Sequence, residues 1–178
     1  MSQNRGPMTK LIPYFWRNPL QLAFLMSASL LAGAYAFQYI GGYPPCDLCW
    51  WQRYAHFAIL GVAGAGMLLK GDARTIAAWG TTIALDISVA AAGFHAGVEQ
   101  KWWQGPSTCT TTGQTQATDM DSLFDSMMET KLILCDEIAW DMFGISMAGY
   151  NFLISLATAL FVTLALAAAL RKREVRTA

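Results

Sequence analysis

Long apolar segments separated by short polar ones dominate this chain. A helix needs about 20 mostly apolar residues to cross a bilayer, and four of these segments are that long. They cover approximately residues 20–40, 50–69, 75–94 and 145–170. In hydrocarbon every backbone polar group must be paired internally, so each segment is predicted to form a helix. The pattern therefore predicts an all-α membrane protein built as a four transmembrane helix bundle.

The composition supports this class. The chain has 178 residues, of which 54% are hydrophobic and 13% charged, whereas soluble domains carry about 25% charged residues. Outside the four segments lie mainly two outer loops, at about 41–49 and 95–144. We therefore expect residues 1–178 to form a single four-helix membrane domain. Membrane lipid, and no nucleic acid, is expected around it.

Basic residues are distributed unevenly between the two sides of this bundle. Nine of the twelve belong to the N-terminal segment, the middle loop and the C-terminal tail, and the other side carries Arg53, Lys101 and Lys131. Loops rich in lysine and arginine stay in the cytoplasm. Both termini are therefore expected in the cytoplasm, and all four cysteines on the outer side. Ala34-Tyr35-Ala36 resembles a signal-peptidase site, but the apolar run continues through Ile40, which favours an uncleaved anchor.

A Cys-x-x-Cys pair, Cys46 and Cys49, stands directly before the second apolar segment. A disulfide across two intervening residues restrains little chain, and such pairs are usually exchange sites. The start of a helix favours thiolate at Cys49. Arg53 lies four residues on, on the same helix face. It is predicted to stabilise a thiolate or a negatively charged acceptor, and snorkelling to the interface is the alternative.

The other two cysteines, Cys109 and Cys135, lie in the long outer loop. They form either a structural bridge or a second catalytic pair. A zinc site usually has a second closely spaced pair or two histidines. Cys109 and Cys135 are 26 positions apart, and His56 is two helical turns from Cys49, so no metal is expected. Because no nucleotide-binding motif occurs, the oxidant is expected to dissolve in the membrane.

These motifs together resemble the bacterial disulfide bond formation protein B (DsbB) family over nearly the whole chain. The motifs are Pro45-Cys46-Asp47-Leu48-Cys49 with Gln52-Arg53, His95-Ala96-Gly97-Val98-Glu99, Trp103-Gln104-Gly105-Pro106 before Cys109, Cys135, Trp140, Phe143-Gly144-Ile145-Ser146-Met147, and Tyr150-Asn151. The resemblance implies a protein of the bacterial inner membrane, with its cysteines in the periplasm. It also implies a thiol oxidoreductase that uses quinone, ubiquinone or menaquinone, as electron acceptor.

The resemblance implies a role for each cysteine. A periplasmic thioredoxin-fold oxidase (DsbA-like) would attack the Cys109–Cys135 disulfide, with Cys109 in the mixed disulfide. Cys135 would then exchange with Cys46, and Cys49 would pass the electrons to quinone.

The resemblance also implies a quinone pocket formed by Arg53, His95 and Met147. For Met147 the alternative is plain helix packing, and for His95 an interfacial hydrogen bond. Two other functions stay open for the chain, a non-catalytic scaffold braced by disulfides and a quinone reductase of the vitamin K epoxide reductase type.

Two features lie outside the resemblance. Helical spacing of Met120, Leu123, Phe124, Met127 and Met128 predicts a short amphipathic helix in the second periplasmic loop, resting on lipid or, alternatively, on a partner. Asp86 lies in the middle of the third apolar segment. We expect it to be protonated and bonded to a neighbouring helix, with a proton relay as the alternative.

Overall fold

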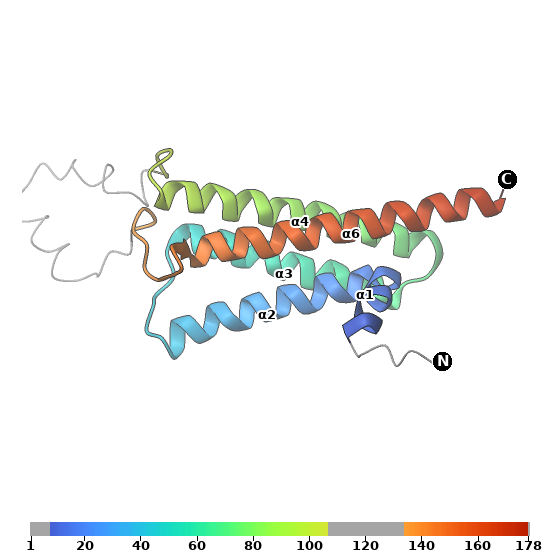
Figure 1. Ribbon diagram of the computed structural model, residues 1–178, viewed down its shortest axis with the longest axis horizontal. Helices are drawn as coiled ribbons and strands as arrows, with labels where there is room; N and C mark the ends of the chain where they lie inside the picture. Colours follow the sequence, from blue (N-terminus) through green and yellow to red (C-terminus); the bar gives the residue numbers. More distant parts are fainter. Residues whose placement is uncertain (1–7, 107–133, 178) are drawn as a thin grey trace, which may run out of the picture.

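The computed structural model describes residues 8–106 and 134–177. Over these residues the fold is helical, with one two-stranded antiparallel hairpin (Figure 1). The helices are α1 (Met8–Arg17), α2 (Pro19–Tyr39), α3 (Asp47–Leu68), α4 (Gly71–Glu99) and α6 (Met147–Thr177). The strands are β1 (Asp141–Met142) and β2 (Ile145–Ser146), which lie directly before α6.

Three helices in the described part of the chain are long and apolar enough to cross a membrane. They are α2, α4 and the Met147–Arg173 part of α6, so three of the four predicted spans are confirmed. The fourth, α3, has 22 residues, a length of about 33 Å at 1.5 Å per residue. Its first turns carry Gln52, Arg53 and His56, and these polar residues lower its apolar character. Whether α3 spans the membrane stays a prediction.

The four long helices run side by side as a bundle (Figure 1). A core cluster at its middle joins Ala23 of α2, Ile59 of α3, Leu85 of α4 and Val162 of α6. The α3–α4 turn and the C-terminal part of α6 lie at one end of the bundle, and the α2–α3 connection, residues 100–106 and the hairpin lie at the other (Figure 1). The bundle therefore separates the basic turn and tail from the Cys46–Cys49 end.

Several helix ends differ from the sequence prediction. α4 begins at Gly71 and continues to Glu99, where the prediction ran from about 75 to 94, and α6 reaches Thr177, where the prediction ended near 170. An apolar run marks the part of a helix that lies in hydrocarbon, and polar turns extend the helix beyond it. His95 and Glu99 are therefore helical residues one turn apart. Cys109 and the predicted amphipathic helix lie outside the described residues.

Asp86 does not occupy the position expected of it. Its side chain is exposed on α4, whereas Leu85 and Ser88 are buried. The helical phase that turns Leu85 and Ser88 into the bundle turns Asp86 outward. The expectation of a bond to a neighbouring helix is therefore not met among the described residues.

Candidate functional site

Cys46 and Cys49 begin α3. Pro44 and Pro45 precede them and hold the approach extended, and Cys46 is the N-cap residue with extended backbone angles. The Cys46 sulfur accepts a hydrogen bond from the Cys49 backbone N–H at 3.3 Å. The two sulfur atoms lie 2.8 Å apart, close to the about 2.05 Å of an S–S bond. The helix start therefore holds the pair ready to form a disulfide.

The Cys46 thiol is buried, with 5% of its surface exposed. Its hydrogen bond to the Cys49 sulfur, together with this burial, raises the pKa of Cys46 above its ordinary value. In the reduced pair the proton therefore stays on Cys46 and is shared with the Cys49 sulfur.

Cys135 packs into the same buried cluster as Cys46, together with Leu48 and Val98. It is almost fully buried, with 1% exposed. A backbone hydrogen bond links Cys135 to the His95 ring, which also approaches the Cys46 sulfur. One cysteine of the outer loop thus lies beside the Cys-x-x-Cys pair, while its predicted partner Cys109 is outside the described residues.

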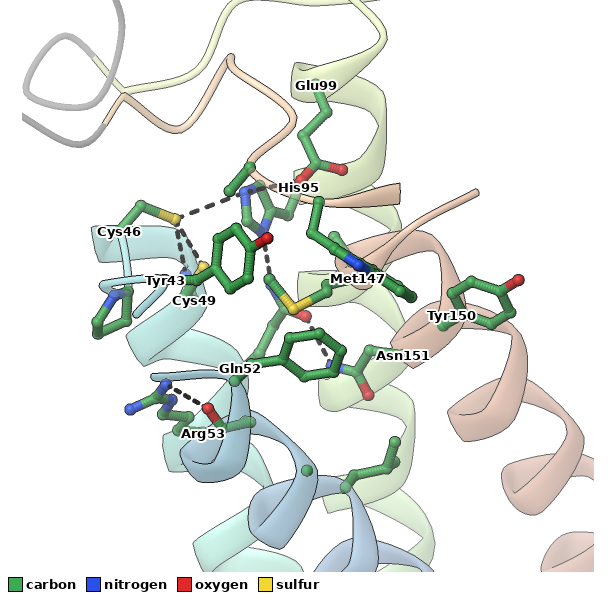
Figure 2. A pocket seen from close by; sticks show the side chains of 18 of the residues that line it. Tyr43, Cys46, Cys49, Gln52, Arg53, His95, Glu99, Met147, Tyr150 and Asn151 are labelled. Atoms are coloured by element: carbon green, nitrogen blue, oxygen red, sulfur yellow. Dashed lines mark hydrogen bonds and ion pairs between the residues drawn. The ribbon is translucent and has the colours of Figure 1, made fainter. Parts of the chain in front are cut away.

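A cavity of 320 Å³ opens beside this cluster (Figure 2). Five residues that the sequence singled out line it: Cys46, Cys49, Arg53, His95 and Met147. Its remaining walls include apolar side chains from α2 and α6: Leu30, Leu31, Phe37, Ala148 and Ile154. Small-molecule sites in proteins are commonly apolar cavities with a few polar groups, and this cavity has that character.

Arg53 is turned into the bundle, with 5% of its surface exposed. One guanidinium nitrogen donates to Gln38 Oε1 at 2.6 Å and another to the Ala34 carbonyl at 3.3 Å. The guanidinium also lies over the rings of Tyr35 and Trp50, 4.7 Å and 4.9 Å from their centroids. These contacts fix a positive charge at the wall of the cavity.

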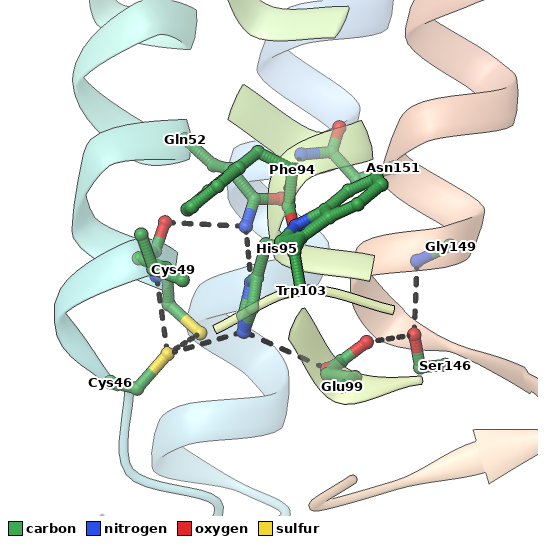
Figure 3. A network of polar contacts seen from close by, with 11 residues as sticks. Cys46, Cys49, Gln52, Phe94, His95, Glu99, Trp103, Ser146, Gly149 and Asn151 are labelled. Atoms are coloured by element: carbon green, nitrogen blue, oxygen red, sulfur yellow. Dashed lines mark hydrogen bonds and ion pairs between the residues drawn. The ribbon is translucent and has the colours of Figure 1, made fainter. Parts of the chain in front are cut away.

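A chain of buried hydrogen bonds runs from the cysteines into the bundle (Figure 3). His95 Nδ1 lies 2.6 Å from Gln52 Nε2. Asn151 Nδ2 donates to Gln52 Oε1 at 2.6 Å. Asn151 Oδ1 in turn lies 3.0 Å from His56 Nε2, and His56 Nδ1 lies 3.2 Å from Ser27 Oγ. This hydrogen-bond chain joins α2, α3, α4 and α6. Polar groups inside a membrane protein have to be paired with one another, because the hydrocarbon offers no water as a partner.

The hydrogen-bond partners of His95 in this network determine which of its ring nitrogens carries the proton. The Gln52 oxygen accepts from Asn151, and the Gln52 amide nitrogen donates to the Leu48 carbonyl. The same amide nitrogen, which can only donate, faces His95 Nδ1. Nδ1 of His95 therefore accepts, and its neutral ring carries the proton on Nε2. That Nε2 bonds the Cys135 backbone and also faces the Cys46 sulfur at 3.6 Å and Glu99 Oε1 at 3.7 Å.

The same geometry bears on metal binding. In the described part of the chain Cys46, Cys49 and His95 bring three possible ligand atoms within 4.8 Å of one another. A histidine that binds a metal usually donates its other N–H to an oxygen acceptor. Here Gln52 donates to the other nitrogen, and the proton on Nε2 faces the sulfurs. These contacts direct the N–H of His95 toward the Cys46 sulfur.

Glu99 completes the polar group. Its side chain is buried, lines the cavity, and accepts a short hydrogen bond from the Ser146 hydroxyl (Figure 3). Ser146 in turn accepts from the Gly149 backbone N–H at 3.1 Å. The hairpin before α6 thereby holds the carboxyl beside His95.

Sequence reasoning did not assign site roles to Gln52, His56, Glu99 and Asn151. A signal for three of them was present, because Gln52, His56 and Asn151 are polar residues within apolar segments. Such residues mark functional sites by default. Glu99 gave no such signal, since it lay in the outer loop predicted for residues 95–144.

The fold and the site define a helical membrane protein with a Cys-x-x-Cys pair at the edge of a largely apolar cavity. Comparison with family models agrees with this class. The chain belongs to the DsbB family, because the model described as disulfide bond formation protein DsbB matches residues 17–165, a range that includes all four cysteines. It is therefore a membrane oxidoreductase of disulfide bond formation. No solved structure matches the chain.

Proposed function

We propose that this protein is a membrane thiol:quinone oxidoreductase that reoxidises a periplasmic, DsbA-like thioredoxin-fold oxidase and thereby sustains disulfide bond formation. The observation that carries the proposal is the position of Cys46. Cys46 packs in one buried cluster with Cys135, its sulfur is 2.8 Å from that of Cys49, and both Cys46 and Cys49 line the cavity. One sulfur therefore connects an outer-loop cysteine with an apolar pocket.

The relay consists of thiol–disulfide exchanges. A thiolate of the partner attacks Cys109 of the Cys109–Cys135 disulfide, and Cys135 leaves as thiolate. Cys135 then attacks Cys46 of the Cys46–Cys49 disulfide, and Cys49 leaves. Each exchange breaks one S–S bond and forms one, so two electrons move inward without a free intermediate. The packing of Cys135 against Cys46 supports the second exchange.

A second round returns the outer pair to its oxidised form. When the partner has closed its own disulfide, the freed Cys109 attacks Cys135, and Cys46 leaves as thiolate. The N–H at His95 Nε2, 3.6 Å from the Cys46 sulfur, stabilises that leaving thiolate. Because thiolate character sets the rate of exchange, His95 assists at the inner end of the relay.

The residues around the cavity fit a quinone. Its apolar walls suit the ring and the start of an isoprenoid tail, and Arg53, His95 and Met147 would hold the head group beside Cys49. Bound there, ubiquinone or menaquinone would supply an acceptor for two electrons and two protons next to the reduced Cys46–Cys49 pair. Arg53 supplies a fixed positive charge on the side where negative charge develops.

The same function requires a defined topology. We propose that α3 is a fourth spanning helix, that residues 1–178 form one membrane domain, and that the protein lies in the bacterial inner membrane. The basic α3–α4 turn and C-terminal tail lie at the end of the bundle opposite to Cys46 and Cys49. By the positive-inside rule that end is cytoplasmic, which puts the cysteines in the periplasm.

Replacing Cys49 tests the proposal. Cys49→Ser should abolish reduction of added quinone by the reduced partner, because the inner disulfide cannot form. The same variant should still trap a mixed disulfide between the partner and Cys109, which serves as its internal control for folding. Quinone reduction at the wild-type rate in Cys49→Ser would contradict the proposed function.

A further inference from the structure

The buried carboxyl of Glu99 has no part in the relay described above. It lies at the end of α4, 9% exposed, beside the sulfur pair and at the wall of the same cavity. A carboxylate in such surroundings is costly unless hydrogen bonds compensate for the lost water. The Ser146 hydroxyl supplies one such bond to Glu99 Oε2, and His95 Nε2 lies 3.7 Å from the other carboxylate oxygen.

The N–H of His95 Nε2, which also bonds the Cys135 backbone, faces two groups that can carry negative charge. It faces Glu99 Oε1 at 3.7 Å and the Cys46 sulfur at 3.6 Å. Since both acceptors lie so close to one nitrogen, they are within about 7 Å of each other, a separation at which two like charges strongly disfavour one another in a protein interior. Glu99 also acts electrostatically on Cys49. A single donor can therefore compensate one negative charge in this site, on the carboxyl or on the sulfur pair.

The other ionisable groups near the carboxyl do not remove this competition. Lys101 is 2.8 Å from Asp136 and is committed to that pair. Arg53, bound to α2 through Gln38 and Ala34, favours a thiolate on Cys49, whereas the Glu99 carboxylate opposes it. The ionisable groups that line the cavity with Glu99 are Cys46 at the N-cap of α3, Cys49, Arg53 and His56 from α3, His95 from α4, Tyr150 from α6, and Tyr43 and Glu137 from the connecting segments.

We propose that Glu99 is a redox-linked proton carrier, ionised while Cys46 and Cys49 form a disulfide and protonated once they are reduced. The inference rests on the proposed function, in which this pair cycles between disulfide and dithiol. Two electrons break the S–S bond. One proton then stays on Cys46, shared with the Cys49 thiolate, and the second proton goes to Glu99. The site thus holds one negative charge in both states, and the His95 N–H turns from the carboxylate to the sulfurs.

Reoxidation reverses each of these steps. The S–S bond re-forms, Cys46 loses its proton, and Glu99 gives up the other. Two electrons and two protons leave together, which is the amount that a quinone takes up. Glu99 therefore matches the proton count of the dithiol to that of the membrane acceptor.

Infrared difference spectroscopy of the purified full chain tests this directly. Reduction of the Cys46–Cys49 disulfide by dithiothreitol should produce the C=O band of a protonated carboxyl group, with loss of a carboxylate band. The band should be missing in Glu99→Gln, and also in Cys49→Ser, where the inner disulfide cannot form. It should persist in Asp141→Asn, which changes an exposed acid at the same end of the bundle. A wild-type spectrum without the carboxyl band would overturn the proposal.

A redox titration gives a second readout that a purely structural role of Glu99 would not alter. Against dithiothreitol, which also exchanges two protons per two electrons, the equilibrium constant of the wild-type inner pair should be independent of pH near neutrality. In Glu99→Gln the pair takes up one proton fewer, so the constant should change about tenfold per pH unit. Identical pH profiles for the two proteins would overturn the proposal.

The two experiments also separate this inference from the proposed function. Alkylation and mass spectrometry report whether Cys46 and Cys49 cycle between disulfide and dithiol at all. A pair that does not cycle contradicts the proposed function. A pair that cycles with no carboxyl band contradicts the role of Glu99 alone.

Discussion

Gln52→Leu removes the centre of the buried hydrogen-bond chain while nearly preserving side-chain volume. Gln52 is 6% exposed, and its amide contacts His95 Nδ1 and Asn151 Nδ2, each at 2.6 Å. In the variant both of these groups lose their partner inside the helix bundle. A buried polar group left unsatisfied costs about 1–3 kcal/mol. The free energy of unfolding should therefore fall by about 2–5 kcal/mol.

For a chain of this size, 1 kcal/mol corresponds to about 2–4 °C in melting temperature. The melting temperature of Gln52→Leu should therefore be about 5–15 °C below that of the wild type in the same detergent. Unfolding is monitored by the reaction of newly exposed cysteines with a thiol-reactive dye. Gln104→Leu is the matched control, because Gln104 is exposed at the same end of the bundle. Its free energy of unfolding should stay within about 0.5 kcal/mol of the wild type.

A double-mutant cycle shows whether Gln52 and Asn151 act through their mutual bond. Asn151→Leu alone leaves Gln52 Oε1 without its donor, and Gln52→Leu alone leaves Asn151 Nδ2 without its acceptor. The double variant leaves neither, so it should cost less than the sum of the single variants, by about 0.5–3 kcal/mol. Two results would refute this reasoning: losses in the free energy of unfolding that simply add in the double variant, or a Gln52→Leu protein with the melting temperature of the wild type.

Three further predictions concern single residues around the site. Arg53→Ala should raise the apparent Kd for quinone about 10–100-fold, the worth of one charge-assisted hydrogen bond, while both disulfides still form. An unchanged affinity would remove Arg53 from the quinone site. Gly97→Ala should lower stability by about 1–3 kcal/mol, because its Cβ would overlap the Trp103 indole; an unchanged melting temperature would contradict that packing. The raised pKa of Cys46 stabilises the reduced fold below the ordinary cysteine pKa of 9.0, a stabilisation that is lost as pH rises above it. Alkylation of reduced Cys46 should accordingly begin only above that pH, and a midpoint below it would contradict the burial of the thiol.

The parts of the site that follow from local sequence were predicted from the chain alone. Cys46, Cys49 and Arg53 are joined by the spacing of one helix, and a helix start fixes their relative positions without help from the rest of the protein. The apolar segments likewise predicted α2, α4 and α6. Their ends were less predictable, since a helix continues through polar residues once its backbone is paired.

The contacts that join different helices could not be derived in the same way. Gln52 and His95 are 43 positions apart and Gln52 and Asn151 are 99 apart, and no local rule pairs residues at such separations. Their polarity within apolar segments marks each of them singly. Only the packed bundle shows that these residues form one hydrogen-bond network. That network determines which nitrogen of His95 carries the proton.

The redox state of Cys46 and Cys49 in quinone-depleted membranes tests the central claim most directly. Thiols are trapped by acid quench and alkylation while the reduced partner is present, and peptides that contain the inner pair are quantified by mass spectrometry. The proposed function predicts that Cys46 and Cys49 accumulate in reduced or mixed-disulfide form without quinone and return to the Cys46–Cys49 disulfide when quinone is added. A pair that stays oxidised under both conditions would be a structural bridge, and that result would contradict the account.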